Sequence, residues 1–418
     1  MHLNPRNVAR VFFSVVFYPM PNLSNRGLQM PPSPIRKLVP FAEAASARGV
    51  RIHHLNIGQP DIYTVPGFME RIRSFEAPVL EYSHSAGMES YRRSYASSMQ
   101  ARGLDLNYQQ IMITTGGSEA LLFAMLSCLD AGDEVLIPEP FYANYNGFAR
   151  MAGVQVVPVP TRIEDGFALP PLTDWEPLIS ARTKAVLICH PNNPTGVMYS
   201  RSELQQLSEL VRRHNLFLFS DEVYRMFAYD GVRHHSVLEW PELADHAVVV
   251  ESVSKVFSAC GARIGALLSR NAELMAVALK YGQARLSPPT LEQLGAEAAL
   301  SASASYFEQV RSAYEQRRNL VVSALRAMPG VVCPHPGGAF YCMVSLPVHD
   351  ADDFCRWMLE SFSHKGCTVM LAPGSGFYAH PESGRQQARI AYVLENDRLS
   401  EAMEALGEGL LQYPGRLN

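Results

Sequence analysis

The amino-acid sequence predicts an α/β fold, in which a large domain with a seven-stranded, mostly parallel sheet flanked by helices joins a smaller α+β domain. Three observations predict it. The chain has 418 residues, and at about 150 residues per domain this length favours two to three domains. From about residue 111, short β-branched apolar runs alternate with helix-period segments, which is typical of parallel strands covered on both faces. After about residue 300 the order of elements changes.

The N-terminal stretch is expected to contain one helix before the sheet begins. Residues 35–48 are amphipathic, prolines precede them, and Gly49 follows where a glycine commonly ends a helix. Further upstream, Arg6 and Arg10 precede the run VFFSVVFY as in a weak signal peptide, but no A-x-A cleavage site follows. An over-long start, with Met20 as the real initiator, is at least as well supported.

Seven apolar runs are expected to form the large sheet. Helix-period segments, such as residues 118–129 and 202–214, lie between them. The runs are IMITT (111–115), EVLIP (134–138), VQVVPV (154–159), AVLICH (185–190), LFLFSDE (216–222), AVVVES (247–252) and RIGALLS (263–269).

The C-terminal part predicts the smaller α+β unit. A long helical segment, 305–328, leads to four further strand-like runs, with a helix over 352–362 and a closing helix near 397–411. The runs are VVCP (331–334), AFYCMV (339–344), TVMLAP (368–373) and ARIAYV (388–393). We expect an extension over 1–30, a segment over 31–60 that joins the small domain, a large domain over 61–300 and a small domain over 301–418.

Composition excludes several classes of protein. The formal net charge is −4, with 47% hydrophobic and 18% charged residues, which is a globular balance rather than a disordered or collagen-like one. No basic block suggests nucleic-acid binding, and the apolar run 11–18 is shorter than the roughly 20 residues of a membrane-spanning helix. Seven scattered cysteines without a CxxC pair favour reduced thiols in the cytoplasm and give no metal site.

Polar residues follow several of the expected strands, at the edge where open parallel sheets bind ligands. A Gly-Gly-Ser turn opens the helix after 111–115, as in an anion cradle, although a turn with a serine cap would also explain it. Asp221 ends another strand, and its burial would be unfavourable without a cationic partner. Lys255 follows a third strand, and Arg263 opens the next. Each residue alone is compatible with a structural role, but together they predict a site.

These residues belong to a set of motifs that resembles the class I/II aminotransferases, the fold-type-I enzymes that use pyridoxal 5′-phosphate (PLP). The chain looks most similar to bacterial aspartate, aromatic and kynurenine aminotransferases, in motif order and spacing, across residues 31–411. The motifs are LNIGQPD (55–61), EYSHSAG (81–87), TTGGSEAL (114–121), PEPFYANY (138–145), NNPTG (192–196), SDEVY (220–224), SVSKVFSACGARIG (252–265), PGGAFY (336–341) and RIAYV (389–393).

The resemblance implies transfer of an amino group from an L-amino acid to a 2-oxo acid by a ping-pong, Schiff-base mechanism. It implies that Lys255 forms the Schiff base with PLP and moves the substrate proton. Asp221 would pair with the pyridine nitrogen, and Asn193 and Tyr224 would hydrogen-bond the phenolic oxygen. Tyr142 would stack on the ring.

The resemblance also implies the sites of the two anionic groups and a homodimer with shared active sites. Arg389 would clamp the substrate α-carboxylate, with Gly58 and Asn193 beside it. Tyr82 would reach the phosphate of the neighbouring subunit. The residues expected to hold the phosphate within one subunit are Gly117, Ser118, Glu119, Ser252 and Arg263.

Two positions depart from the family pattern. Glu119 is a carboxylate beside the expected phosphate, so only its backbone N–H could contribute, with the side chain turned away. Dicarboxylate-specific members often carry an arginine in the loop that corresponds to residues 285–290, which the partner subunit would contribute to the site. This chain has Arg285 there, so aspartate specificity stays open. Because the other residues expected at the substrate side chain are apolar or aromatic (Ile57, Tyr142, Phe340), neutral or aromatic donors are expected to be accepted at least as well as aspartate.

Three other functions fit parts of this pattern. A PLP-dependent carbon–sulfur lyase or a cyclopropane-forming synthase would share the lysine, aspartate and arginine, although GQPD resembles the aminotransferases more. A transcription regulator with this fold would need a DNA-binding domain in front, and only about 30 residues precede the first family-like helix. A catalytically dead binding module is disfavoured because Lys255 and Asp221 are both present.

Overall fold

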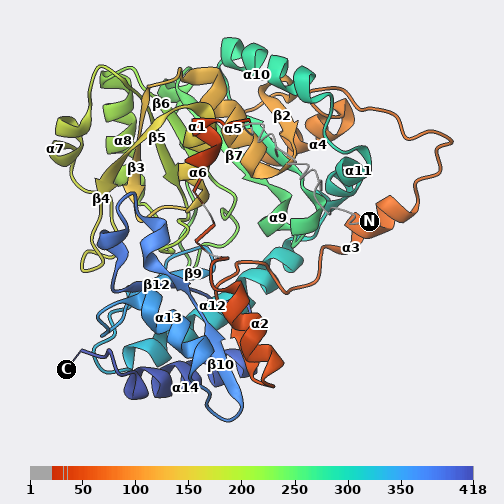
Figure 1. Cartoon of the computed structure of the whole chain (residues 1–418). Helices are drawn as coiled ribbons and strands as arrows, with labels where there is room; N and C mark the ends of the chain where they lie inside the picture. The colour runs from red at the N-terminus through yellow and green to blue at the C-terminus, as the bar shows by residue number, and fades with distance from the viewer. Residues whose placement is uncertain (1–20, 32, 35, 418) are drawn as a thin grey trace, which may run out of the picture.

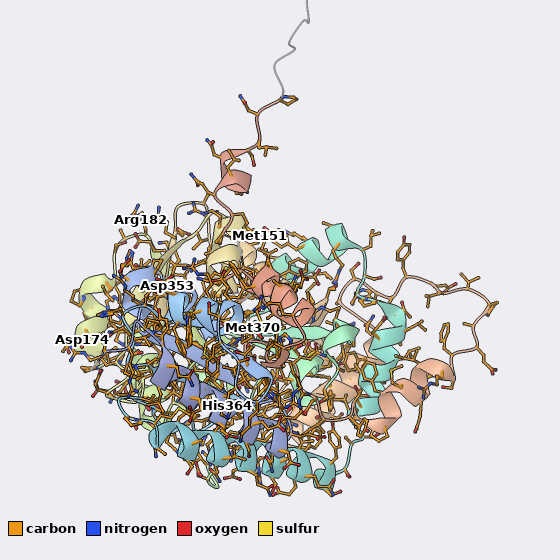
Figure 2. All side chains as sticks on the ribbon, turned by 60° about the horizontal axis from the view of Figure 1, so that its bottom comes forward. Met151, Asp174, Arg182, Asp353, His364 and Met370 are labelled. Atoms are coloured by element: carbon orange, nitrogen blue, oxygen red, sulfur yellow. The ribbon has the colours of Figure 1, made fainter. Side chains whose placement is uncertain are left out.

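The computed structural model describes residues 21–31, 33–34 and 36–417. Figure 1 shows two parts packed against each other, with the large sheet and its helices in the upper part and the C-terminal elements, in blue, below them. The segment that carries α1 (Asn25–Leu28) stands out from the body in Figure 2. The expected leader or alternative start at Met20 lies outside the described residues.

The large sheet has seven strands in the order β2-β8-β7-β6-β5-β3-β4. Only β8 runs antiparallel to its neighbours β2 and β7, so the sheet is mostly parallel and all seven predicted strands are confirmed. Their bounds are β2 Ile111–Thr114, β3 Glu134–Glu139, β4 Gln155–Pro160, β5 Thr183–Cys189, β6 Phe217–Asp221, β7 Ala247–Ser252 and β8 Gly265–Leu268.

Both faces of this sheet are buried, as the continuous apolar runs predict. Along β5, Leu187 belongs to one hydrophobic cluster, whereas Val186 and Ile188 belong to another on the opposite face, because side chains alternate along a strand. Helices supply the covering layers. They are α3 Pro66–Arg73, α4 Glu89–Gln100, α5 Gly116–Cys128, α6 Asn144–Ala152, α8 Arg201–Arg213, α10 Ala272–Arg285 and α11 Thr290–Ala299, with the short α7 Leu172–Trp175 and α9 Val253–Val256.

The C-terminal part forms the predicted α+β unit. Strands β11 (Ala372–Pro373), β12 (Gln387–Ala391) and β9 (Tyr341–Ser345) make an antiparallel sheet in that order. Separately, β1 (Arg51–His54) pairs in parallel with β10 (Cys367–Met370). This pairing supports the expected joining of residues 31–60 to the small domain, whose boundaries stay predictions. The helices of this part are α2 Val39–Ala47, α12 Ala304–Arg326, α13 Ala351–Glu360 and α14 Asn396–Gln412.

Two elements differ from the prediction. Helix α2 begins at Val39 rather than at position 35, which itself lies outside the described residues. Pro40 explains the later start, because a proline fits the first turn but would break the interior of a longer helix. The run VVCP (331–334) is not a strand, since only Val332 bridges to Ser345 and Pro334 has no N–H to donate.

Short 3₁₀ helices connect several of these elements. They are η1 Tyr108–Gln110, η2 Glu176–Leu178, η3 Val237–Glu239, η4 Pro241–Leu243, η5 Cys260–Ala262, η6 Gly374–Phe377 and η7 Pro381–Gly384. Within the described residues, no helix combines the length and the apolar composition needed to cross a bilayer.

Candidate active site

A cavity of ≈ 630 Å³ lies where the carboxyl ends of the large-sheet strands meet β9 and β12 of the small unit. Asp221 ends β6, Ser252 ends β7, and Lys255 follows on α9, so consecutive strands deliver these side chains to one edge. All but two of the predicted site residues line it. Those that do are Gly58, Gly117, Ser118, Tyr142, Asn193, Asp221, Tyr224, Ser252, Lys255, Arg263 and Arg389.

The amine of Lys255 is held inside this cavity by neutral groups. Its Nζ donates a hydrogen bond to the Gly58 carbonyl at 2.7 Å and lies 3.6 Å from the Cys260 Sγ. Burial lowers the pKa of the Lys255 amine, and the nearby Arg389 and Arg263 guanidinium groups lower it further, against an opposing effect of Cys260. The arrangement shifts the amine toward its neutral, nucleophilic form, and none of its hydrogen-bond partners among the described residues is a carboxylate.

The carboxylate of Asp221 is only partly satisfied by the protein. Tyr145 donates its hydroxyl proton to Asp221 Oδ2 at 2.7 Å, and the Val223 N–H donates to Oδ1 at 3.4 Å. Burial raises the pKa of Asp221 to about 6, although the hydrogen bond from Tyr145 opposes this. A cationic group bound in the cavity beside Asp221 would favour the ionised carboxylate.

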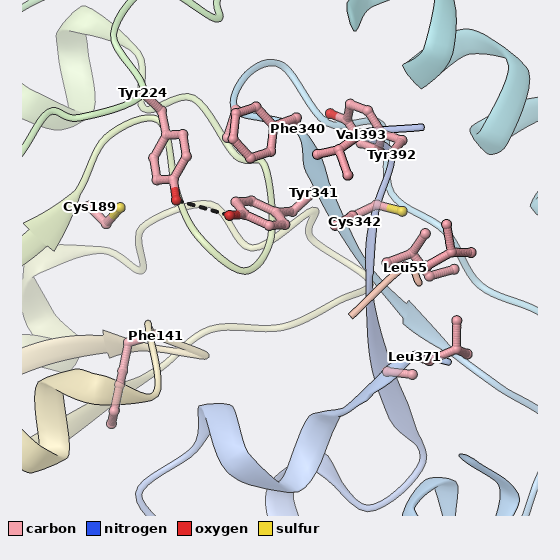
Figure 3. Packing of buried hydrophobic residues seen from close by; sticks show 14 of the residues in the cluster. Leu55, Phe141, Cys189, Tyr224, Phe340, Tyr341, Cys342, Leu371, Tyr392 and Val393 are labelled. Carbon is pink, nitrogen blue, oxygen red and sulfur yellow. Dashed lines mark hydrogen bonds between the residues drawn. The ribbon is translucent and has the colours of Figure 1, made fainter. Parts of the chain in front are cut away.

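A continuous polar chain runs from the large sheet to β12. Arg389 donates through Nη1 to Asn193 Oδ1 at 2.9 Å and through Nη2 to the Asn56 carbonyl at 2.6 Å, while its buried Nε has no protein partner. The Asn193 amide donates to the Tyr224 hydroxyl at 3.5 Å. The hydroxyls of Tyr224 and Tyr341 are 3.0 Å apart, as the dashed line in Figure 3 marks. These hydrogen bonds orient the Arg389 guanidinium, and its Nε remains available to donate a hydrogen bond to an incoming anion.

The start of α5 and Arg263 form a cradle suited to an anion. Helix α5 begins at Gly116, so the first-turn N–H groups at Gly117 and Ser118 have no partner within the helix. A β-carbon at residue 265 would lie 2.4 Å from the Gly116 carbonyl carbon, so only glycine lets β8 approach this turn. Arg263 adopts a left-handed backbone (φ 53°) and donates to the Cys260 carbonyl at 3.1 Å.

Glu119 and Arg285 are engaged with each other rather than with the cavity. Arg285 Nη1 and Glu119 Oε2 are 2.7 Å apart, and the same carboxylate accepts the Thr115 N–H at 2.7 Å. Arg285 also donates to the Ser85 and Ile113 carbonyls. The Glu119 side chain is therefore turned away, as expected, and Arg285 does not point into the cavity of its own subunit.

Tyr82 is the other predicted site residue that does not line the cavity. It is 80% exposed, on the loop between α3 and α4 that reaches away from the body in Figures 1 and 2. We call this loop, residues 74–88, the Tyr82 arm. Three other large apolar side chains on or near it, Tyr63, Val79 and Leu80, are also exposed.

Sequence reasoning missed or misplaced three aromatic residues. Phe340, expected at the substrate, is fully buried against Tyr224, and the next residue, Tyr341, lines the cavity instead. Neighbours in an extended segment face opposite sides, so a shift of one residue exchanges their roles. Tyr145, which holds Asp221, lies in the first turn of α6, and its N–H donates to the carbonyl of Tyr142, which precedes the helix, at 2.9 Å.

The residues present fit PLP. The buried amine of Lys255 can bond to the PLP aldehyde. The buried Asp221 carboxylate can accept a further hydrogen bond, as the PLP ring nitrogen requires. The first turn of α5 and Arg263 can bind the PLP phosphate. Arg389, with its unpartnered Nε, remains for a substrate carboxylate. The cavity volume lies within the usual range of small-molecule and cofactor sites.

Comparison with known proteins agrees with this chemistry. The sequence profile of the family described as "Aminotransferase class I and II" matches residues 51–406. The chain is 31% identical to the aspartate aminotransferase of Bacillus subtilis (strain 168), with 92% of this chain and 98% of that protein covered. It is also 31% identical to aromatic-amino-acid aminotransferase 2 of Thermococcus litoralis, over 92% of this chain and 97% of that protein.

Among solved structures, the aspartate aminotransferase from Thermus thermophilus with maleate superimposes with a TM-score of 0.85. The identity is 30%, and the match covers 94% of this chain and 100% of that one. The relatives and structures named here are aminotransferases, so the carbon–sulfur lyase alternative is not favoured.

Proposed function

The chain belongs to the class I and II aminotransferase family and is a PLP-dependent aminotransferase; from this premise we propose which residues carry out the transfer and how the active protein is assembled. The observation that carries the assignment of roles is that Lys255, Asp221 and Arg389 line one cavity, each with capacity for a further partner.

Bound PLP supplies an aldehyde that links covalently to amines and a protonated ring that takes up the electron pair left on the substrate Cα. In our proposal Asp221 keeps the ring nitrogen protonated, while Asn193 and Tyr224 donate hydrogen bonds to its phenolic oxygen. Tyr142 stacks on the ring, and Gly117, Ser118, Glu119, Ser252 and Arg263 hold the phosphate, Glu119 through its backbone only.

Lys255 acts as the proton carrier in this proposal. With PLP and an amino-acid substrate bound, the Lys255 Nζ would accept the proton from the substrate Cα. The lowered pKa of this amine supports the role, because a base that is already protonated cannot accept a proton. The Gly58 carbonyl accepts a hydrogen bond from Nζ at 2.7 Å, so it orients the amine and adds no charged group beside it.

Arg389 binds the α-carboxylate of the donor and of the 2-oxo acid, with Asn193 and Gly58 beside it. Its contacts to Asn193 and to the Asn56 carbonyl fix the plane of the guanidinium before a substrate arrives, which reduces the ordering cost of binding. The half-exposed Ile57 and the aromatic Tyr142 at the same cavity support acceptance of neutral and aromatic side chains.

The proposed active unit is a homodimer. Tyr82 cannot serve its own cavity, which it does not line, and its loop carries exposed apolar side chains that favour burial against a second copy. In this arrangement Tyr82 donates its hydroxyl to the phosphate held by the neighbouring subunit. The cytoplasm is the proposed location, supported by seven cysteines that are all free thiols.

The half-reaction tests the proposed function. The PLP-loaded protein is mixed with one L-amino acid and no oxo acid, and the yellow absorbance and the products are followed. We expect the absorbance to fall, one equivalent of 2-oxo acid to appear per site, and 2-oxoglutarate to restore the colour. Release of ammonia with catalytic formation of the oxo acid and no need for an acceptor would indicate an eliminating enzyme instead.

A further inference from the structure

Residues 55–65, which we call the linking segment, cross from the small unit to the large one and contain the motif GQPD. At the start of the segment, the Leu55 N–H donates to the Met370 carbonyl of β10 at 3.0 Å. Near its end, the Thr64 hydroxyl donates to the Ser258 carbonyl, just after α9, at 2.7 Å. The proposed function assigns no role to the aspartate of the motif.

Two backbone carbonyls of the linking segment contact cations of the active site. The Asn56 carbonyl accepts a hydrogen bond from Arg389 at 2.6 Å, and the Gly58 carbonyl accepts one from Lys255 at 2.7 Å. Because these acceptors belong to the main chain, their positions are set by the path of the segment. A β-carbon at position 58 would overlap the Tyr341 hydroxyl, so the main chain passes close to the cavity wall. A displacement of the segment would therefore disturb Arg389 and Lys255 together.

The aspartate of GQPD ties the linking segment to Arg317 of α12. Arg317 donates through Nη1 to Asp61 Oδ1 at 2.6 Å and through Nη2 to Asp61 Oδ2 at 3.2 Å, the paired geometry that a planar guanidinium forms with a carboxylate. Its Nη1 also donates to the Val393 carbonyl at 2.7 Å, four residues beyond Arg389. Tyr63 is exposed, so burial fixes this part of the segment only in part. Arg317 therefore connects the linking segment to the end of the strand that carries Arg389.

Helix α12 holds Arg317 firmly against the wall of the site. Tyr314 precedes Arg317 by three positions on the same face of the helix, and the guanidinium lies 5.0 Å from the centre of the tyrosine ring. The buried Tyr314 ring stacks on Phe340 with 5.3 Å between ring centres. Phe340 in turn packs edge-on against Tyr224 at 5.2 Å (Figure 3). The Arg317 side chain, only 8% exposed, is thus fixed relative to the residues of the cavity.

We propose that Arg317 is a positioning residue for the transfer reaction, which acts through Asp61 to hold the two carbonyls of the linking segment against Lys255 and Arg389. This rests on the proposed function of those two residues. Arg317 is not among the described residues that line the cavity, so its effect passes through the segment. By also holding the Val393 carbonyl, it fixes the spacing between the segment and the strand of Arg389. Groups that are oriented before the substrate arrives reduce the ordering cost of binding.

The test measures substrate binding and segment mobility in the holoenzyme. The variants are Arg317→Met, Asp61→Asn, the double variant and the conservative Arg317→Lys. The matched control is Arg311→Met, which removes an exposed ion pair with Glu308 on the same helix.

Three quantities are measured per PLP-bound site. The first is KM for aspartate and for phenylalanine. The second is Kd for 2-aminoisobutyrate, which has the α-amino and α-carboxylate groups but no Cα hydrogen, from the change in PLP absorbance. The third is hydrogen–deuterium exchange of peptides that cover residues 55–65.

We expect Arg317→Met and Asp61→Asn each to raise both KM values and the Kd of 2-aminoisobutyrate by about tenfold, the scale of one hydrogen bond to a charged group. Amide exchange within residues 55–65 should become faster in both. The double variant should bind no more weakly than the weaker single variant, because both changes remove the same contact. Arg317→Lys should lose less than Arg317→Met, and Arg311→Met should match the wild type in all three quantities.

An unchanged Kd for 2-aminoisobutyrate in Arg317→Met and Asp61→Asn, with only the melting temperature lowered, would show that the ion pair serves stability alone and would overturn the proposal. Additive losses in the double variant would also overturn it, because Arg317 would then act without Asp61. If Arg317→Met does not fold, Asp61→Asn and Arg317→Lys provide the same comparison. Absence of transamination by the wild type would instead refute the proposed function, which the Arg317 variants do not test.

Discussion

We call Lys255, Asp221 and Arg389 the inner wall of the cavity, and Arg36 and Ile57 its mouth. The two groups differ in how many of their side chains are held in place by other residues. On the inner wall, Lys255, Asp221 and Arg389 each have a protein partner within 2.9 Å. At the mouth, Arg36 has no partner among the described residues, and Ile57 is 48% exposed. Preorganised groups suit a reaction that is the same for every substrate, whereas exposed groups suit contacts that vary between substrates.

This difference suggests a division of labour. Removing an inner-wall group should affect every substrate alike, because its proposed target is the α-amino group, the α-carboxylate or the cofactor. Removing a group at the mouth, or on the Tyr82 arm, should affect only one substrate class or one step of assembly. The following predictions test that division, from the largest expected effect to the smallest.

Replacing Lys255 with alanine should have the largest effect. We expect Lys255→Ala to fold, to bind PLP without a covalent link and to lose at least about ten-thousandfold in transamination with every donor, since the proton carrier is absent. Borohydride reduction followed by mass spectrometry checks the link. Covalent fixation of the cofactor in the Ala variant would show that another lysine has the role.

Asp221→Ala should retain the cofactor and lose about a hundredfold to a thousandfold in kcat, the scale of removing one preorganised electrostatic contact. The loss should be similar for aspartate and phenylalanine. Asp221→Asn, which keeps the shape of the side chain but cannot carry the charge, is the matched control and should be nearly as slow. Turnover at the wild-type rate in either variant would remove Asp221 from this role.

Replacing Tyr82 should affect the active site of the neighbouring subunit and not that of its own. Tyr82→Phe should weaken PLP binding by about tenfold, through loss of one hydrogen bond to a charged group. A heterodimer of one Lys255→Ala subunit and one Tyr82→Phe subunit should recover one intact site. Its activity at limiting PLP is compared with that of both parent homodimers. Activity no higher than either parent would contradict shared sites.

Arg285→Met should have the smallest effect on catalysis. Its ion pair with Glu119 and its bonds to two carbonyls are structural, with side-chain exposures of 15% and 17%. We expect a loss of about 1–3 kcal/mol in unfolding free energy, the cost of leaving a charge-paired group unsatisfied, and an unchanged ratio of aspartate to 2-aminobutyrate activity. Urea denaturation and the same substrate pair provide the measurement.

The sequence predicted the inner wall far better than the mouth. Asp221 and Lys255 follow continuous apolar runs, and such runs mark both a strand and its end, so the edge where these residues meet could be inferred from the order of the strands. The seven strands of the large sheet follow from the same signal. Tyr145 was not predicted, because nothing local in the motif PEPFYANY indicates which of its two tyrosines reaches Asp221.

The mouth could not be predicted because it depends on contacts between distant parts of the chain. Arg285 and Glu119 are 166 residues apart, and nothing local in either segment indicates that they pair. Arg36 lies before a helix whose start the sequence misplaced by four residues, since Pro40 delays it. Whether a surface arginine faces a cavity depends on how Pro34 and Leu38 pack against the C-terminal unit, which local sequence does not specify.

The measurement that tests the division most directly is kcat/KM of Arg389→Leu for aspartate, 2-aminobutyrate, alanine and phenylalanine. Arg389 is a fully buried inner-wall residue, so its loss should reduce all four values by a similar factor of about a hundred or more, the scale of truncating one partner of a buried charge pair. The ratios between them should stay within about threefold of those in the wild type, with PLP absorbance retained. A loss confined to the diacid, or to the neutral donors, would contradict the separation of a common inner wall from a selective mouth.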